Sequence, residues 1–170
     1  MIYDIRTYGD PVLRKEALPV EDVNDEIREI IDSMVESMHE AGGVGLAAPQ
    51  IGVSKRIFVI DIEDGKIRKV INPEFLEFSK EIVEHEEGCL SVPGVYKKVK
   101  RPARVKIKYT NENGEKVIEE AEGLLSRAFQ HEADHLDATL FVDKLSPVAK
   151  RMVSKKLQAL KKETEKKDIK

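Results

Sequence analysis

The sequence is short of the features that mark several large classes of protein. It contains one cysteine, Cys89, so no disulfide bond can form within the chain. No segment approaches the roughly 18 consecutive apolar residues that a membrane-spanning helix needs. The N-terminal segment Met1–Glu16 mixes charges with Gly and Pro and lacks the apolar core of a signal peptide. These absences exclude a disulfide-stabilised secreted scaffold, and we expect a cytoplasmic protein.

The composition is that of a folded globular protein. Hydrophobic residues make up 41% of the chain and charged residues 36%. The length of 170 residues suits a single catalytic domain, residues 1–170. Residues 147–170 form a basic C-terminal helix or tail, with nine Lys or Arg against three Asp or Glu, although the whole chain has a net charge of −3. Such a tail can favour nucleic acid, but a solvated helix face is the more common explanation.

The hydrophobic pattern predicts helices near both ends and strands between them. A first helix should begin after Asn24, a typical N-cap, and end at Gly42. A second should cover 123–137, and a third should start near Pro147, with one apolar face formed by Val148, Met152, Val153, Leu157 and Leu160. We expect strands at 56–61, 70–71, 82–85, 104–109 and 116–121, with an Asn113-Gly114 turn joining the last two.

This order of elements predicts an α+β fold. Mixed or antiparallel β-sheets should surround the second helix, which would be central, and the other two helices should lie N-terminal and C-terminal to them.

The second predicted helix contains the pattern HExxH, at His131–His135. Residues four apart on a helix lie on one face, so the two imidazoles can reach one metal ion. Glu132 follows the first histidine directly, where its carboxylate can move protons at such a site. The alternative, an ordinary charged helix turn, explains this combination less well. A catalytic metal site usually has three protein ligands and one open position, so a third ligand is needed.

Cys89 is the preferred candidate for the third metal ligand. It lies in a turn-like break between strands, and a thiolate suits Zn²⁺ or Fe²⁺. The metzincin pattern would need Gly and His at the positions of Ala138 and Phe141, so that assignment fails. His85 and Glu163 stay open as rival ligands, and a lone cysteine is often inert core. The nearby acidic residues Glu84, Glu86 and Glu87 fit a charged surface face.

The segment Gly43–Gln50, with the sequence GVGLAAPQ, superficially matches a dinucleotide-binding fingerprint. That fingerprint requires a strand before it and a helix after it, whereas here a helix precedes and Pro49 follows. We therefore interpret the segment as a loop whose small residues let the backbone approach an extended substrate. The side-chain amide of Gln50 could donate to a developing oxyanion.

Three segments in this order resemble the three signature motifs of the bacterial peptide deformylase family: Gly43–Gln50, Glu87–Ser91 and Gln130–Leu136. The resemblance extends over nearly the whole chain. It implies a metal-dependent hydrolase that removes the N-formyl group from the N-terminal formylmethionine of nascent polypeptides and releases formate. It also implies one divalent metal ion, usually Fe²⁺, with Zn²⁺, Ni²⁺ or Co²⁺ as other occupants.

The resemblance also implies a role for each matching position. Three positions match metal ligands, one a catalytic carboxylate, two the donors that hold the formyl oxygen, and one a backbone contact to the peptide. In that order they are Cys89, His131 and His135; Glu132; Gln50 and the backbone N–H of Leu90; and Gly45.

The resemblance is looser around the predicted methionine pocket and at the end of the metal-binding helix. We expect Val44, Leu124 and Ala128 to help form an apolar pocket for the methionine side chain, although core packing would also explain the last two. Ala128 and its neighbour Arg127 occupy positions that vary in the family. Ala138 stands where the family commonly has Gly.

Three other functions remain as alternatives. An HExxH peptidase would cleave internal peptide bonds and would not require a formyl group. A metal-stabilised binding module would have a closed four-ligand site, with His85 as a candidate fourth ligand. A nucleic-acid-binding domain would depend on the basic tail, but the acidic remainder of the chain argues against this as the whole function. The tail could still dock on ribosomal RNA near emerging chains.

Overall fold

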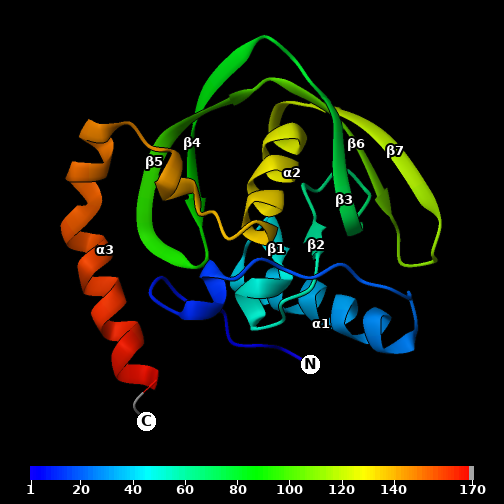
Figure 1. The fold of residues 1–170 in the computed structure, drawn as a ribbon, viewed down its shortest axis with the longest axis horizontal. Coiled ribbons are helices and arrows are strands. Elements are labelled where there is room, and N and C mark those ends of the chain that lie inside the picture. The colour runs from blue at the N-terminus through cyan, green and yellow to red at the C-terminus, as the bar shows by residue number, and fades with distance from the viewer. Residues whose placement is uncertain (169–170) are drawn as a thin grey trace.

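The computed structural model describes residues 1–168 and confirms the α+β fold class. The three α-helices of this part of the chain are α1 (Asp25–Ala41), α2 (Gly123–Leu136) and α3 (Pro147–Asp168). A five-stranded sheet has the order β1-β2-β3-β6-β7, and a separate two-stranded sheet consists of β4 and β5. Helix α2 lies between the two sheets (Figure 1).

All paired strands are antiparallel. The strands are β1 (Gly45–Ala47), β2 (Ile57–Ile60), β3 (Arg68–Phe78), β4 (Ile82–Cys89), β5 (Val92–Pro102), β6 (Arg104–Thr110) and β7 (Lys116–Glu122). Short 3₁₀ helices occur at Pro11–Arg14 (η1), Ala48–Ile51 (η2) and Phe141–Lys144 (η3).

Local sequence signals place the boundaries of α1 as predicted. The side chain of Asn24 accepts a hydrogen bond from the backbone N–H of Ile27, which satisfies one free donor of the first turn. The helix ends at Gly42, whose φ of 73° is the left-handed conformation that favours glycine at this position. On its apolar face, Met34 and Met38 are fully buried in one core cluster together with residues of β1 and β2, and Ile30 and Val35 pack against this cluster partly buried.

Helix α2 is buried in the centre of the molecule. Phe129 is fully buried, and its ring centroid lies 6.2 Å from those of both Phe58 on β2 and Tyr109 on β6. These contacts bind α2 to the inner face of the five-stranded sheet. The opposite side of the helix is therefore free to face β4 and β5.

Strands β1 and β5 were missed in the sequence. The pattern over β5 is broken by Pro93 and by Gly94, which adopts a φ of 80°. A two-stranded sheet tolerates this interruption because each strand needs hydrogen bonds on one edge only. Strand β1 is three residues long and lies within the glycine-rich segment, so it is too short and its side chains are too small to show the alternating pattern of a strand.

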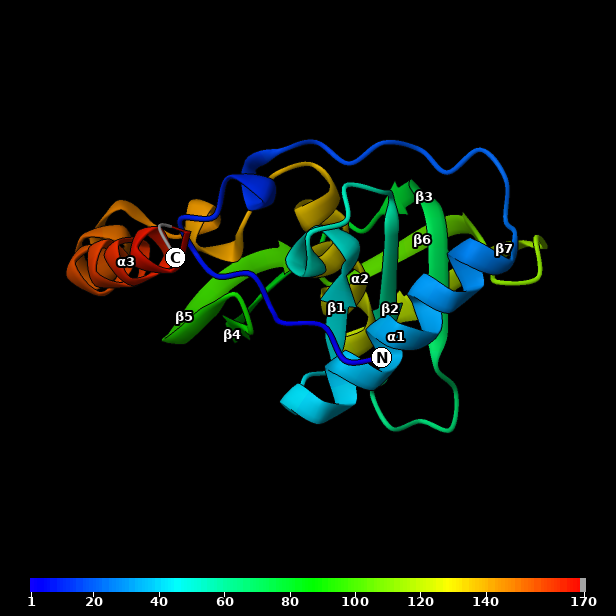
Figure 2. The same ribbon diagram turned by 90° about the horizontal axis from the view of Figure 1, so that it is seen from below.

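Helix α3 begins at Pro147, as predicted, and lies beside β5 (Figures 1 and 2). Val153, Leu157 and Leu160 pack into a core cluster with β5 and η3. The prediction was wrong for Val148 and Met152, which are 58% and 66% exposed. Successive residues turn by about 100°, so these two lie about 140° and 100° around the helix from Val153.

None of the helices formed by residues 1–168 combines the length and the apolar character needed to cross a membrane.

The end of α2 contains a strained backbone position at Ala138, whose φ is 60°. A side chain in this left-handed region costs about 1–2 kcal/mol, a cost that glycine avoids. We predict that Ala138→Gly raises the free energy of unfolding by about 1 kcal/mol, because it removes this strain. The gain is smaller than the full cost of the strain, since glycine loses more chain entropy on folding than alanine does. Denaturant titration measures this.

A matched control for this prediction is Ala159→Gly. Ala159 is exposed in the interior of α3, where glycine should lower stability by about 1 kcal/mol. A loss of stability in both variants would contradict the account of Ala138.

Candidate metal centre

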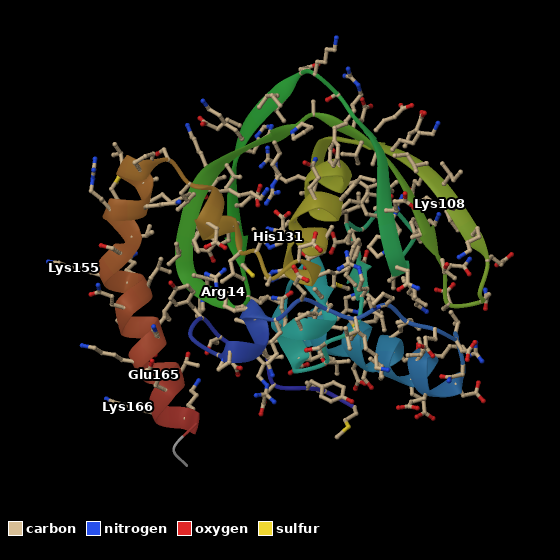
Figure 3. The ribbon with its side chains drawn as sticks, viewed as in Figure 1. Arg14, Lys108, His131, Lys155, Glu165 and Lys166 are labelled. Carbon is tan, nitrogen blue, oxygen red and sulfur yellow. The ribbon has the colours of Figure 1, made fainter. Side chains whose placement is uncertain are left out.

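Two histidines of α2 lie close to a cysteine of β4, on the side of the helix that faces the hairpin formed by β4 and β5. One ligand atom each of Cys89, His131 and His135 lies within 4.8 Å of the others. The Cys89 Sγ is 3.4 Å from the Nε2 of His135, and the two imidazole centroids are 5.3 Å apart. Figure 3 shows His131 in the interior, between α2 and the hairpin. The candidate ligands therefore converge, as the sequence predicted.

This donor set fits a divalent metal ion. Tetrahedral coordination with Zn–S of about 2.3 Å and Zn–N of about 2.05 Å separates the two ligand atoms by about 3.6 Å. The observed distance from Cys89 Sγ to His135 Nε2, 3.4 Å, is close to that value. The rival ligands His85 and Glu163 are exposed and do not belong to the group. Among the described residues, the cluster thus has three members.

Glu132 lies next to this cluster as a buried acid. Its side chain is 6% exposed, and its Oε2 is 4.0 Å from the Nε2 of His131. The other oxygen, Oε1, is buried and has no hydrogen-bond partner among the described residues. Burial raises the pKa of Glu132 to about 7, against the opposing effect of the His131 charge. A carboxyl group with this pKa can accept and return a proton near neutral pH.

The two histidines have different electrostatic surroundings. Burial lowers the pKa of His135 well below its ordinary value, and the positive charges of His131 and Arg101 act in the same direction. Burial would also lower the pKa of His131, but Glu132 and Cys89 outweigh it and raise this pKa well above the ordinary value. Because metal ligation requires neutral imidazole, metal binding at His131 would release a proton.

Gly45 on β1 lies directly against the carboxylate of Glu132. A Cβ atom built at Gly45 would lie 2.5 Å from the Oε2 of Glu132, closer than any real contact allows. The sequence predicted only that this glycine lets the backbone approach a substrate. The structure adds a second reason, because any side chain here would displace the acid.

Gln50 is held in place from both ends of its amide. Its Oε1 accepts a hydrogen bond from the backbone N–H of Ala47 at 2.9 Å. Its Nε2 donates to the Ser91 hydroxyl at 3.0 Å and lies 3.5 Å from the Cys89 Sγ. The amide nitrogen therefore lies beside the sulfur of the cluster.

The cluster opens into a cavity of about 420 Å³ between β1, α2 and the β4–β5 turn. All three residues predicted to form the apolar pocket line it. Ala128 is buried, whereas Val44 and Leu124 are 47% and 54% exposed. Leu90 and Tyr96 complete the wall on the hairpin side.

Glu87 was placed on a charged surface face by sequence reasoning, and the structure corrects this. It is 6% exposed and accepts hydrogen bonds from the Nε and Nη2 of Arg101 at 2.6 and 2.9 Å. It also lies 2.9 Å from the Nδ1 of His131. Strand alternation does not reveal this, because the pairing of β4 with β5 is irregular between Glu87 and Cys89 and His85, two residues before Glu87, is exposed.

Comparisons with known proteins agree with this geometry. The family model described as "Polypeptide deformylase" matches residues 2–151. A peptide deformylase of Fusobacterium nucleatum is 58% identical over 166 residues, covering 96% of this chain and 95% of the relative. The solved structure of the Thermus thermophilus peptide deformylase has a TM-score of 0.91 at 43% identity, covering 96% of this chain and 99% of that one. The solved structure from Thermotoga maritima has a TM-score of 0.84 at 49% identity, covering 86% and 99%.

These relationships extend over far more than the three motifs. The family model covers most of the chain, and the relatives match it at high identity along nearly their full lengths. The chain therefore belongs to the polypeptide deformylase family.

Proposed function

We propose that this chain is a metal-dependent peptide deformylase that acts on nascent polypeptides. It hydrolyses the formyl amide of N-terminal formylmethionine and releases formate. One observation carries the proposal: a thiol and two imidazoles converge beside a buried acid whose Oε1 has no partner among the described residues, at a cavity open to a substrate. Membership of the family supports it. Because nascent chains carry the formyl group where they are made, we place the enzyme in the cytoplasm.

We propose that Cys89, His131 and His135 hold one divalent ion, with Fe²⁺ preferred and Zn²⁺, Ni²⁺ or Co²⁺ as other occupants. The mixed sulfur and nitrogen donors suit these metals. When bound, such an ion supplies Lewis acidity, which lowers the pKa of water and polarises a carbonyl oxygen. Metal analysis of anaerobically purified protein identifies the resident ion.

Glu132 is the proton carrier in this proposal. It accepts a proton from the attacking water, whose oxygen bonds to the formyl carbon. The carbon–nitrogen bond then breaks, and Glu132 gives the proton to the leaving amine, so that the products are formate and a free N-terminus. The pKa of about 7 suits both halves of this exchange.

The formyl oxygen would be held by the side-chain amide of Gln50 and the backbone N–H of Leu90. Gln50 is already fixed beside Cys89 by its bonds to Ala47 and Ser91, so it can donate without further ordering. Donors positioned in advance stabilise developing negative charge, and losing one typically costs about 10²–10³ in kcat.

The peptide would bind in an extended conformation along the edge of β1. Within residues 1–168 this strand ends the five-stranded sheet and pairs with β2 only, so Gly45 and its neighbours can pair with a peptide backbone. The methionine side chain would enter the cavity lined by Val44, Leu124 and Ala128. A formyl carbon carries only hydrogen, so a narrow centre admits it and excludes bulkier acyl groups.

We also propose that α3 docks on ribosomal RNA. Its apolar face is covered by β5 and η3, while its Lys and Arg side chains between 150 and 167 are exposed. Figure 3 shows Lys155 and Lys166 directed away from the body of the molecule. Basic side chains of this kind bind phosphate groups, and the binding weakens as salt rises.

The acid is tested by Glu132→Ala. We predict that this variant keeps its metal and loses turnover of N-formyl-Met peptides by at least about 10²-fold, because proton transfer fails. Formate release measures this, and the wild-type enzyme should leave unformylated peptides uncut. Cleavage of internal bonds in unformylated peptides would instead identify a general peptidase.

The ligand set is tested by Cys89→Ser. A hydroxyl is a weaker ligand than a thiolate for these metals, so we predict reduced metal content after dialysis and a changed absorption spectrum with Co²⁺. An unaltered metal content would exclude Cys89 as a ligand. His85→Ala is the matched control, because this exposed histidine lies on the same strand outside the cluster and should leave binding unchanged.

Docking of α3 is tested by replacing Lys155, Lys162 and Lys166 with Glu together. We predict weaker binding to ribosomes and a salt dependence whose slope falls by about three, one unit for each lost phosphate contact. The control carries Glu at the exposed lysines Lys66, Lys80 and Lys108, which are remote from α3 in the sequence. Equal losses in both variants would show that net charge, and not α3, governs the binding.

A further inference from the structure

A second buried arginine, Arg127, lies behind the metal ligands. It is 8% exposed and precedes His131 on α2 by one helical turn. Its Nη1 donates to the Glu87 carboxylate and, at 3.0 Å, to the carbonyl oxygen of Val99 on β5. Its Nη2 donates to the carbonyl oxygen of Val83 on β4 at 3.1 Å. One guanidinium thus binds three acceptors on both strands of the hairpin.

These contacts connect the β4–β5 hairpin to α2, and the metal cluster consists of residues from both. The hairpin β4–β5 forms a sheet of its own and carries Cys89, whereas α2 packs on the five-stranded sheet and carries both histidines. The distance from sulfur to imidazole is therefore set by contacts between the hairpin and α2. Arg101 reaches from β5 to Asp134 on α2 at 2.8 Å, and Arg127 reaches in the opposite direction, from α2 to β5.

Arg127 also completes the binding of the Glu87 carboxylate. The Oε1 of Glu87 accepts from Arg101 and lies 2.9 Å from the Nδ1 of His131. Its Oε2 accepts from Arg101 and from Arg127. With both oxygens held, the carboxylate cannot rotate, and it keeps the imidazole of His131 turned so that Nε2 faces the cluster. Contacts of this kind behind a metal ligand fix its tautomer and orientation.

We propose that Arg127 is a positioning residue for the metal centre. It locks the hairpin to α2 and holds Glu87 against His131, so that sulfur and nitrogen are preset at metal-binding distance. This inference rests on the proposed function, because it assumes that the cluster binds a metal.

The test is Arg127→Leu, which keeps an apolar stem and removes all three hydrogen bonds of the guanidinium. We predict that the dissociation constant for Zn²⁺, measured by competition with a chromophoric chelator, rises at least about tenfold. The kcat of the metal-loaded enzyme should also fall. Arg127→Lys should not restore affinity, because a single ammonium cannot make the same planar fork of contacts. KM is a poor readout here, since Arg127 also lines the cavity.

Arg68→Leu is the matched control. Arg68 is 7% exposed and is likewise paired with two carboxylates, Glu119 and Asp64, but it lies on β3 away from the hairpin. It should lower thermal stability and leave the Zn²⁺ dissociation constant unchanged. An unchanged constant in Arg127→Leu, or equal increases in both variants, would overturn the positioning role.

A second measurement keeps the test decisive if Arg127→Leu folds poorly. In a Glu87→Gln background, Arg127→Lys should change Zn²⁺ affinity less than it does in the wild-type background, because both substitutions loosen the same contact. Fully additive effects would overturn the inference. The proposed function fails separately, if the wild-type protein itself binds no Zn²⁺.

Discussion

The structure depends on bringing the sulfur atom of Cys89, at the end of β4, to the imidazoles of His131 and His135 on α2. Strand β4 belongs to the two-stranded sheet, whereas α2 packs on the five-stranded sheet. Side-chain charges do much of this joining: Glu87 and Asp134 are negative, Arg101 and Arg127 are positive, and together they balance. Buried charges are costly unless each is paired and hydrogen-bonded, so this group favours one relative placement of hairpin and helix over the alternatives. Hydrophobic burial alone would not specify that placement, because apolar contacts are not directional.

Rigidity around the centre is distributed over several elements. Phe129 anchors α2 to the five-stranded sheet, and α3 covers the outer face of β5 through Val153 and Leu157. The side of α2 away from the hairpin is thus packed on the five-stranded sheet, and the outer face of the hairpin is packed against α3. The charged residues Glu87, Asp134, Arg101 and Arg127 fix the distance between α2 and the hairpin. The cavity lies at the open side of the gap between them.

The features that could be predicted from the sequence are those determined by residues that lie close together in it. Helix caps such as Asn24 and the HExxH spacing depend on residues within one or two turns, and both were found where expected. The pairing of Cys89 with the histidines depends on tertiary contact across more than 40 residues, so spacing alone left it open and the family resemblance was needed. Strand β5 was missed because Pro93 and Gly94 interrupt its pattern. Glu87 was misplaced because a buried carboxylate is recognisable only when its arginine partners are known.

The contact between Gly45 and Glu132 has a consequence for how recognition relates to chemistry. Strand β1, whose edge we propose to pair with a peptide, also contains Gly45, which leaves no room for a side chain beside the carboxylate of Glu132. A ligand that shifts β1 on binding also changes the distance between Gly45 and the carboxylate of Glu132. Under the proposed function, the position of the peptide main chain and the position of the Glu132 carboxylate therefore depend on each other, and substitutions along β1 are limited by both.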